Sequence, residues 1–480
     1  MMYDVIVIGG GIVGSALLRE LSHTNLKALL LEKCDDVACG CSRANSGIVH
    51  AGYDAEPGTK KAKFNVLGNA MYFELAKEMH VPCQRIGSLV LAEESGYAGL
   101  ETLLERGKKN GVPDLRIVGR DELVQMEPNV GDNVRYALYA PTAGIVSPYE
   151  MTIAMAEQAV LNGAEVRCCE TVQGISFCNG RFEVKTQNAV YQSSYVVNCA
   201  GYGAAEINAM AGEKSLSQEY KRGDYFILDS VERSRFHHVC FPLPTKAGKG
   251  ILVSPTADGN VIVGPTSVPV ETGDDTAVKA DGLNRIREDV GKMMKNVNFG
   301  KGIRVFAGVR TSVGEDFVVE NGKNKAFLIA AGICSPGLTA APAIAKYLVD
   351  ELLPQAGASV ERKEKYVVRE AMPVTRNLSK EEWAALIRKN PAYSRMVCRC
   401  EKITEGEILD ALDSPLHPRS VDALKRRVRT GMGRCQGGFC TPKIMEIIHE
   451  HCGLSLEEIT KEGKGSEIVV GDIKEGNYAD

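Results

Sequence analysis

Three glycines near the N-terminus constrain the fold of this chain more than any other feature. Gly9, Gly11 and Gly14 directly follow a short apolar run, residues 3–8, and precede a helical segment, residues 15–23. In a strand–turn–helix unit the first glycine makes the tight turn, the second lets the backbone approach a pyrophosphate, and the third lets the helix pack closely on the strand. The pattern predicts an α/β nucleotide-binding domain whose helix N-terminus faces the phosphates.

An acidic residue after the next apolar run supports this interpretation. Residues 28–31 are apolar, and Glu32 follows them at the spacing expected after the glycine motif. A carboxylate at this position holds ribose hydroxyls, which favours FAD or NAD over NADP. A glycine-rich turn in an unrelated α/β domain is the alternative interpretation.

Four cysteines near the C-terminus form the second informative pattern. Cys398 and Cys400 are separated by one residue, and Cys435 and Cys440, further along the chain, are separated by four. Thiolates are soft ligands, so four that converge suit zinc or an iron–sulfur cluster. Structural zinc sites more often use Cys-x-x-Cys knuckles, so the Cys-x-Cys spacing favours the cluster.

The sequence after Glu32 resembles the FAD-dependent D-amino-acid-oxidase superfamily, and within it the L-2-hydroxyglutarate oxidase/dehydrogenase branch. The resemblance is carried by Asn-Ser-Gly-Ile-Val-His-Ala-Gly-Tyr at 45–53. Further similar segments lie at 57–62, 144–149, 196–201, 222–226, 264–266, 307–310 and 330–339. The resemblance covers most of residues 1–350. It implies an α/β Rossmann-type FAD domain with an inserted β-rich substrate domain.

The same resemblance implies which residues contact the flavin. The segment 330–339 opens a helix, expected over 340–352, whose N-terminus would stabilise charge on the reduced flavin. The implied cofactor-binding residues are Gly9, Gly11, Gly14, Glu32, Lys33, Ser46, Gly47, Gly201, Gly332, Gly337, Leu338 and Thr339.

Two residues are candidates for the chemistry. His50 lies in the segment that the resemblance places against the flavin ring, and an imidazole suits general-base catalysis near neutral pH. A flavin-contacting histidine without a proton role is the alternative. The resemblance places Arg310 at the substrate, where its planar fork would pair with an anionic group. Weaker candidates are Tyr53, Lys60, Arg222 and Tyr225.

The substrate expected first is a small 2-hydroxy acid similar to L-2-hydroxyglutarate. FAD-dependent glycerol-3-phosphate dehydrogenase is the nearest competing family, and it usually carries Gly-Gly-Lys-x-x-Thr-Tyr-Arg at the end of its flavin domain. The corresponding stretch here, residues 331–336, contains no Lys or Arg, which favours a carboxylate over a phosphate. The 2-hydroxyglutarate branch often has Gly-Lys where this chain has Gly87-Ser88, which argues against 2-hydroxyglutarate itself as the substrate. An amino acid is the third alternative on the same scaffold.

The C-terminal cysteines resemble the bacterioferritin-associated-ferredoxin-like [2Fe-2S] domain, so Cys398, Cys400, Cys435 and Cys440 are the implied metal ligands. A small helical domain is expected, with a helix from Thr404 to about residue 412, a basic helix near 420–428 and a helix at 443–452. The cluster would pass electrons from FAD to an acceptor protein or a flavin/NAD oxidoreductase subunit. A zinc- or cluster-bearing assembly or sensor protein is the alternative of another class.

The expected domains are a flavin oxidoreductase at 1–365, a linker at 366–393, a [2Fe-2S] domain at 394–455 and a tail at 456–480, partly disordered. The net charge of −4 indicates no nucleic-acid partner, and no apolar run is long enough for a membrane span, which leaves peripheral association open. Fifteen cysteines without a recognisable signal peptide predict a cytoplasmic protein with reduced thiols.

Overall fold

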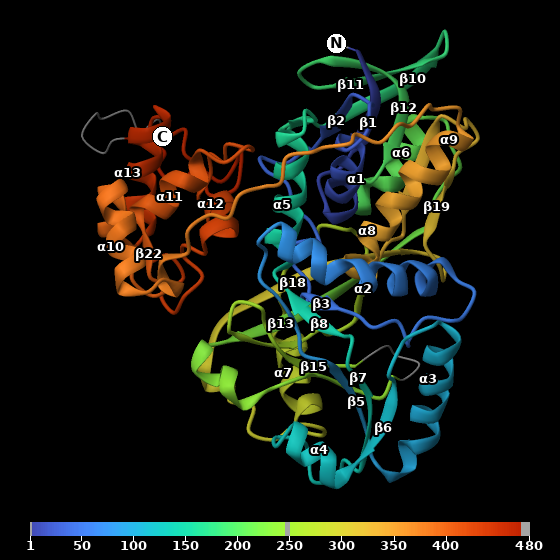
Figure 1. Ribbon diagram of the computed structural model, residues 1–480, viewed down its shortest axis with the longest axis vertical. Coiled ribbons are helices and arrows are strands. Elements are labelled where there is room, and N and C mark those ends of the chain that lie inside the picture. Colours follow the sequence, from blue (N-terminus) through green and yellow to red (C-terminus); the bar gives the residue numbers. More distant parts are fainter. Residues whose placement is uncertain (1, 245–249, 472–480) are drawn as a thin grey trace, which may run out of the picture. The chain divides into compact units, whose positions relative to one another are not determined.

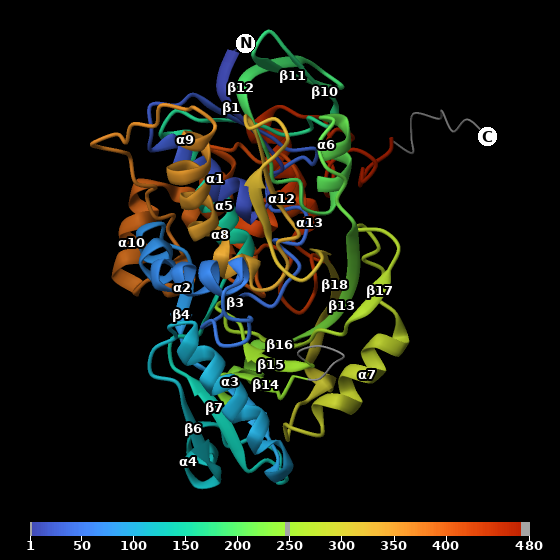
Figure 2. The ribbon, with the colours of Figure 1, turned by 90° about the vertical axis from the view of Figure 1, so that its right-hand side faces the viewer.

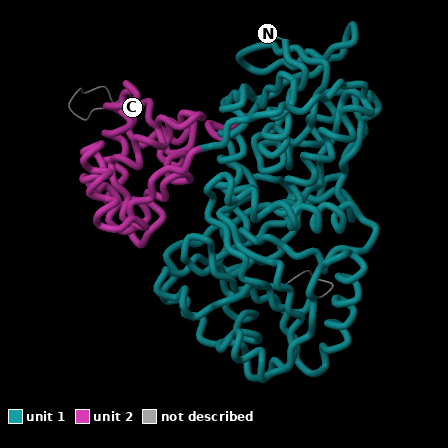
Figure 3. The backbone as a smooth tube through the Cα atoms, viewed as in Figure 1, with its two compact units in different colours: residues 1–32, 37–369 teal, residues 33–36, 370–480 magenta. Residues whose placement is uncertain are grey.

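The computed structural model describes residues 2–244 and 250–471, and the chain divides into two compact units (Figure 3). Unit 1 comprises Met1–Glu32 and Val37–Arg369. Unit 2 comprises Glu370–Asp480 together with a four-residue segment from the N-terminal region, Lys33–Asp36. None of the helices in the described ranges combines the length and the apolar character needed to cross a bilayer.

Unit 1 contains a mainly parallel sheet formed by short, fully apolar segments. Its parallel strands follow the order β20–β12–β1–β2–β9, and β10, β11 and β19 extend it in antiparallel fashion. These strands are β1 (Met2–Ile8), β2 (Ala28–Leu31), β9 (Glu165–Arg167), β10 (Val172–Cys178), β11 (Arg181–Thr186), β12 (Val190–Asn198), β19 (Val318–Asn321) and β20 (Phe327–Ala331). Continuous apolar runs such as β2 form parallel strands because helices cover both faces.

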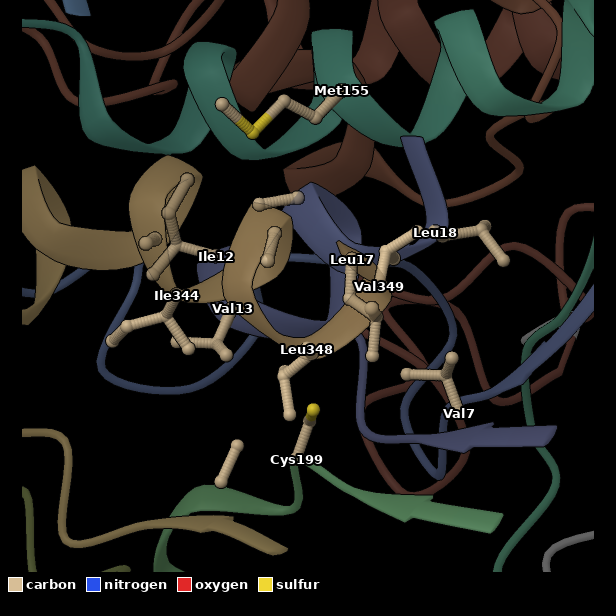
Figure 4. Packing of buried hydrophobic residues seen from close by; sticks show 14 of the residues in the cluster. Val7, Ile12, Val13, Leu17, Leu18, Met155, Cys199, Ile344, Leu348 and Val349 are labelled. Carbon is tan, nitrogen blue, oxygen red and sulfur yellow. The ribbon is translucent and has the colours of Figure 1, made fainter. Parts of the chain in front are cut away.

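One face of this sheet shares an apolar cluster with four helices (Figure 1). They are α1 (Ile12–Ser22), α2 (Lys60–Glu78), α5 (Pro148–Leu161) and α8 (Gly337–Tyr347), which continues through Leu348–Leu352 into α9 (Leu353–Gln355). Figure 4 shows Leu17, Met155 and Leu348 in the apolar cluster that these helices form with the sheet. On the other face, α6 (Ala204–Met210) contributes buried apolar residues to a second cluster. The two clusters give the glycine turn after β1 a rigid support.

A second, larger sheet of unit 1 is built from two separate chain segments (Figure 2). The first segment contributes β5 (Ser88–Ala92), β6 (Arg116–Gly119) and β7 (Tyr136–Ala140). The second contributes β13 (Gln218–Leu228), β14 (Val239–Pro242), β15 (Leu252–Pro255), β16 (Val261–Gly264), β17 (Val268–Val270) and β18 (Gly302–Val313). Helices α3 (Tyr97–Lys109), α4 (Arg120–Met126) and α7 (Ala280–Val290) pack on it. This sheet is the β-rich insertion that the resemblance implies.

A small three-stranded sheet joins segments on either side of the first insertion. It consists of β3 (Ile48–Val49), β8 (Gly144–Val146) and β4 (Cys83–Arg85), with β8 in the centre. Because β3 immediately precedes His50, this sheet fixes the start of the segment that carries the candidate base.

Unit 2 is mainly helical and has its own apolar core. It contains α10 (Lys380–Lys389), α11 (Glu405–Leu412), α12 (Val421–Val428) and α13 (Thr441–Cys452), with two short strands, β21 (Met396–Cys398) and β22 (Ile403–Thr404). A capping box between Thr404 and Glu407 starts α11, as the sequence predicts. Pro442 lies in the first turn of α13, which begins two residues earlier than expected.

The boundaries of the C-terminal region differ from those expected. Unit 2 begins at residue 370, so most of the expected linker 366–393 is part of a packed unit and includes α10. The expected tail begins at 456, yet Ile459 is fully buried in the core of unit 2 and the backbone of Thr460 pairs with Val421. Residues 472–480 of that tail lie outside the described residues.

Candidate functional site

The glycine turn after β1 leaves no room for side chains, as a nucleotide cradle requires. Gly9 has a φ of +107°, and a Cβ there would lie 2.6 Å from the carbonyl oxygen of Cys199. A Cβ on Gly14 would collide with the carbonyl oxygen of Gly9. The Glu32 carboxylate lies at the end of β2 and accepts a 2.6 Å hydrogen bond from the Gly10 N–H. These positions fit the diphosphate and ribose of FAD.

Residues of the loop before β3 complete the cradle on one side. The Ser42 hydroxyl accepts a 2.8 Å hydrogen bond from the backbone N–H of Ile12, in the first turn of α1. A Cβ on Gly11 would lie 3.3 Å from the same hydroxyl. Gly47 has a φ of +65°, and a Cβ there would lie 2.5 Å from the carbonyl oxygen of Val146. The loop therefore packs tightly from the turn of α1 to β8.

Two further glycine segments follow β12, which pairs with β1, and β20, which pairs with β12. Gly201 comes three residues after β12 and Gly332 directly after β20. Because parallel strands end at the same edge, both glycines lie at the edge that carries the Gly9 turn. Gly337, Leu338 and Thr339 form the first turn of α8. The structure thus brings the predicted FAD contacts of unit 1 to one edge of the sheet.

Lys33 is the one predicted cofactor contact that falls in the other unit. It is exposed and belongs to the segment Lys33–Asp36 of unit 2. Nothing in the sequence after β2 indicates that Lys33–Asp36 belongs to unit 2 and not to the flavin domain.

The backbone of His50 is held by side chains from two helices. Its N–H donates to the Thr339 hydroxyl at 2.9 Å, and its carbonyl oxygen accepts from Asn69 at 3.1 Å and Asn65 at 3.3 Å. Thr339 also donates to the carbonyl oxygen of Ile48. Neither asparagine could be identified from the sequence, because the apolar residues of α2 follow no clear helical stripe that would show which amides are buried.

The imidazole of His50 faces a pocket. Its Nε2 lies 3.3 Å from the Ser335 hydroxyl, in the loop between β20 and α8, and its ring stacks against Phe241 with centroids 5.9 Å apart. The pocket is lined by His50, Tyr53, Asp54, Val90, Phe241 and Pro244. Ser335 sets the direction of the ring, and no local sequence signal indicates it because the two residues meet only in the folded chain.

Arg310 lies on β18 of the second sheet of unit 1, on the face that contacts the loop before His50. A Cβ on its neighbour Gly308 would collide with the carbonyl oxygen of Ala44, so loop and strand are in contact. The guanidinium donates to the carbonyl oxygen of Thr266 at 2.8 Å. Among the described residues no carboxylate pairs with it. The positive charge of Arg310 is therefore available for an anion.

Tyr225 lies beside Arg310 on the neighbouring strand. Its ring stacks on Phe306 with centroids 4.7 Å apart and planes 9° apart. Burial raises the pKa of Tyr225 to about 12, against the opposing effects of the nearby Arg310 charge and a hydrogen bond with Ser46. The phenol is neutral at physiological pH and links the predicted flavin contact Ser46 to the predicted substrate contact Arg310.

The four C-terminal cysteines lie in two pairs. The sulfurs of Cys400 and Cys435 are 3.6 Å apart. Cys398 and Cys440 are both buried and hydrogen-bonded to each other, and that bond lowers the pKa of Cys398 to about 6. Cys452 lies at the end of α13. No group of three His, Cys, Asp or Glu side chains within the described residues converges as for one metal ion.

Most of the seven further cysteines that lie in apolar stretches of the sequence are not core residues. Among the seven at 34, 83, 168, 169, 199, 240 and 334, Cys199 and Cys240 are buried and Cys169 is exposed. The rest are half-buried, and all are free thiols. Neighbouring apolar letters do not report which face of a strand or loop a residue occupies.

Comparisons with known proteins agree with this geometry. A family model described as FAD dependent oxidoreductase matches residues 4–351, and one described as BFD-like [2Fe-2S] binding domain matches residues 396–450. A glycerol 3-phosphate dehydrogenase from Caloramator mitchellensis is 42% identical over 477 residues, which cover 98% of this chain and 99% of the relative.

Two further relatives cover unit 1. The structure of dithionite-reduced L-α-glycerophosphate oxidase from Mycoplasma pneumoniae with FAD bound aligns with a TM-score of 0.73 at 28% identity, covering 78% of this chain and 99% of the other. A mitochondrial L-2-hydroxyglutarate dehydrogenase from Arabidopsis thaliana is 27% identical over 73% of this chain and 83% of its own length. The chain belongs to the FAD-dependent oxidoreductases, as a dehydrogenase of CH–OH groups with FAD and a [2Fe-2S] cluster as cofactors.

Proposed function

We propose that the protein is a glycerol-3-phosphate dehydrogenase that passes electrons from FAD through its [2Fe-2S] cluster to a partner. The observation that carries this proposal is the similarity over the full length, cluster region included, to a glycerol 3-phosphate dehydrogenase. A flavoenzyme that used dioxygen directly would need no relay, so the acceptor is a protein or a flavin/NAD oxidoreductase subunit. The free thiols suit a reducing compartment such as the cytoplasm.

This proposal replaces the 2-hydroxy acid that the sequence placed first. The argument for a carboxylate rested on the absence of Lys and Arg at 331–336. Arg310 answers it, because a guanidinium on β18 that pairs with no carboxylate in the described part of the chain can hold a phosphate as well as a carboxylate. The similarity to L-2-hydroxyglutarate dehydrogenase is lower and covers less of both chains, which makes that activity the second candidate.

The residues of unit 1 have distinct roles in the proposed reaction. When bound, FAD supplies a hydride acceptor and the cluster supplies a one-electron carrier. His50 removes the proton of the substrate hydroxyl at its Nε2, since Ser335 and Phe241 orient the ring toward the pocket. Arg310 binds the phosphate and thereby fixes the carbon that is oxidised. The bonds from Thr339 and Asn69 keep the His50 backbone still during proton transfer.

The cysteine pairs of unit 2 fit a two-iron cluster. Two thiolates on one tetrahedral metal with bonds of about 2.3 Å lie about 3.8 Å apart. The 3.6 Å separation of Cys400 and Cys435 is close to this value, so this pair would hold one iron and the buried pair Cys398 and Cys440 would hold the other. Cys400 is exposed, so the pair Cys400 and Cys435 is the one more accessible to solvent.

The test of the substrate is anaerobic reduction of the oxidised holoenzyme with glycerol 3-phosphate, L-2-hydroxyglutarate and amino acids in parallel. We expect glycerol 3-phosphate to bleach the flavin band and then the cluster band within a turnover. Bleaching by L-2-hydroxyglutarate alone would overturn the substrate assignment. A cluster band that stays oxidised while the flavin is reduced would overturn the relay. Iron and zinc analysis of anaerobically purified protein separates the cluster from zinc.

Variants test the residues. His50→Asn should lower the rate of flavin reduction by about 10²- to 10⁴-fold, the usual contribution of a general base, with smaller change in substrate affinity. Arg310→Met should instead raise the substrate concentration needed for reduction. Cys400→Ser should change the visible spectrum of the cluster, whereas the matched Cys452→Ser should not. An unchanged reduction rate in His50→Asn would leave His50 as a flavin contact only.

A further inference from the structure

We propose that Thr266 and Asp224, supported by Arg222, form a positioning device that aims the Arg310 guanidinium at the substrate anion. The proposal rests on the function proposed above, in which Arg310 is the anion anchor. It assigns a role to the Arg-Gly-Asp-Tyr segment at 222–225, which is distinctive in the sequence and has no part in the mechanism so far.

The device starts from the single protein acceptor that the guanidinium has within the described ranges. The Nη2 of Arg310 donates to the carbonyl oxygen of Thr266 at 2.8 Å. A guanidinium carries five N–H donors in a fixed plane, so one bond to a rigid carbonyl sets that plane and leaves other donors for a ligand. The direction of the fork therefore depends on how firmly Thr266 is held.

Thr266 is held by a reciprocal pair of bonds to Asp224. Its hydroxyl donates to the Asp224 carboxylate at 2.9 Å and accepts from the Asp224 backbone N–H at 2.9 Å. The backbone N–H of Thr266 donates to the carbonyl oxygen of Asp224 at 3.3 Å. Thr266 is 2% exposed and Asp224 is 0% exposed. Bonds to a buried carboxylate are stronger than bonds at the surface, so the carbonyl of Thr266 cannot rotate freely.

The alternation of β13 separates the device into a front and a back. Across β18, Lys221, Gly223 and Tyr225 are paired with residues 310, 308 and 306, so they share the face of Arg310. Arg222 and Asp224 point to the opposite face. Thr266 lies in the connection between β16 and β17. Its hydroxyl binds Asp224, which is on one face of the sheet, and its carbonyl oxygen binds Arg310, which is on the other face.

The back of the device is an ion pair that is costly to bury. Arg222 and Asp224 are 2% and 0% exposed, and Arg222 Nε lies 3.4 Å from the Asp224 carboxylate without hydrogen-bond geometry. Arg222 also donates to both carboxylate oxygens of Asp275, each at 3.0 Å. Apolar residues of similar volume often stabilise a fold better than such a pair. A role in orienting Arg310 would explain why the Arg222–Asp224 pair is present although it contributes little to stability.

Two glycines make room for the device. A Cβ on Gly223 would lie 2.6 Å from the Pro265 side chain and 3.5 Å from the Arg310 guanidinium. A Cβ on Gly282, in the first turn of α7, would collide with the Asp224 carboxylate. Arg310 and Asp224 therefore each lie against a glycine backbone at a position where a side chain would not fit.

The test uses the holoenzyme and inorganic phosphate as the probe, with binding measured by calorimetry and by the perturbation of the oxidised flavin spectrum. Thr266→Val removes both hydroxyl bonds. We expect it to weaken phosphate binding about tenfold, which corresponds to about 1.4 kcal/mol, and to raise KM for glycerol 3-phosphate with a smaller change in kcat. Thr266→Ser keeps the hydroxyl and should restore binding to within about twofold. If Thr266→Val does not fold, Thr266→Ala takes its place with the same expectation.

A matched control is available in the first sheet. Thr186 on β11 is also 2% exposed, and its hydroxyl likewise donates to one group and accepts from another, the C=O and N–H of Ala189. Thr186→Val should leave phosphate binding unchanged. Equal phosphate affinity in Thr266→Val and wild type, with Arg310→Met deficient, would overturn the positioning role alone. Unchanged phosphate affinity in Arg310→Met would instead overturn the anchor role in the proposed function.

Discussion

Unit 2 encloses a buried ion pair whose loss should be readily measured. Asp36, in the segment Lys33–Asp36, accepts from Arg427 at 2.7 and 3.1 Å and from Arg426 at 3.1 Å. The side chains of all three are at most 4% exposed. Asp36→Asn would remove a negative charge that two buried guanidiniums share. Breaking a buried pair in this way costs about 3–5 kcal/mol, and the retained amide oxygen places the expected value near the lower end.

The assay follows thermal unfolding of the holoenzyme at the visible band of the cluster. A loss of about 3 kcal/mol should lower the midpoint of this transition by roughly 10 °C or more for a domain of this size. Glu457→Gln, an exposed acid of unit 2, serves as the control with no expected shift. Replacing Asp36, Arg426 and Arg427 together by Leu and two Met should recover much of the stability. A midpoint for Asp36→Asn within 2 °C of wild type (about 0.5 kcal/mol) would refute the reasoning.

The pH dependence gives the same prediction a second readout. Burial raises the pKa of Asp36, but the charges and hydrogen bonds of Arg427 and Arg426 outweigh it, so the pKa is lowered below its usual 3.8. A lowered folded-state pKa stabilises the protein above the unfolded-state pKa of about 3.9, and this contribution is lost as the pH falls through the folded-state value. Between about pH 6 and about pH 3 the cluster transition of wild type should therefore fall more steeply than that of Asp36→Asn.

Three further predictions follow from local geometry. Gly14→Ala places a Cβ against the carbonyl oxygen of Gly9, so the protein should be purified with little or no FAD, measured by the flavin-to-protein absorbance ratio, and normal FAD content would contradict the assigned cradle. Thr404→Ala removes the hydroxyl that accepts from the N–H of Glu407 and should destabilise unit 2 by about 1 kcal/mol in the thermal assay, while an unchanged midpoint would show that packing alone starts α11. Because burial raises the pKa of Tyr225 to about 12, Tyr225→Phe should leave the shape of the pH–rate profile unchanged below about pH 10, and loss of an alkaline limb there would contradict a neutral phenol.

Much of the fold could be predicted because its signals are local. The glycine turn, the acid after β2 and the capping box at Thr404 are each read within about 20 residues of sequence, where strand and helix geometry decide which residue types fit. The expected helices at 404–412, 420–428 and 443–452 lie within about two residues of α11, α12 and α13.

The parts that could not be predicted depend on contacts between distant segments. Ser335 approaches His50 across 285 residues, and Thr266 binds Arg310 across 44. Sequence periodicity reports which face of an element is buried and is silent on which distant side chain faces it. The order of the candidate substrates also could not be predicted correctly, because the absence of Lys and Arg at 331–336 does not distinguish a carboxylate from a phosphate.

The return of Lys33–Asp36 to unit 2 bears on how such a protein could arise. A domain that is fused to one end of another protein consists only of residues beyond the junction. Such a domain can be exchanged without changing the sequence of the protein that carries it. Here Asp36 belongs to unit 2 but precedes the rest of that unit in the sequence by more than 300 residues, so a simple fusion would have lacked this buried acidic group until the host acquired it. Transplanting residues 370–480 onto a flavoprotein without this segment should therefore give an impaired module. Homologues that lack the cluster region are expected to vary freely at position 36.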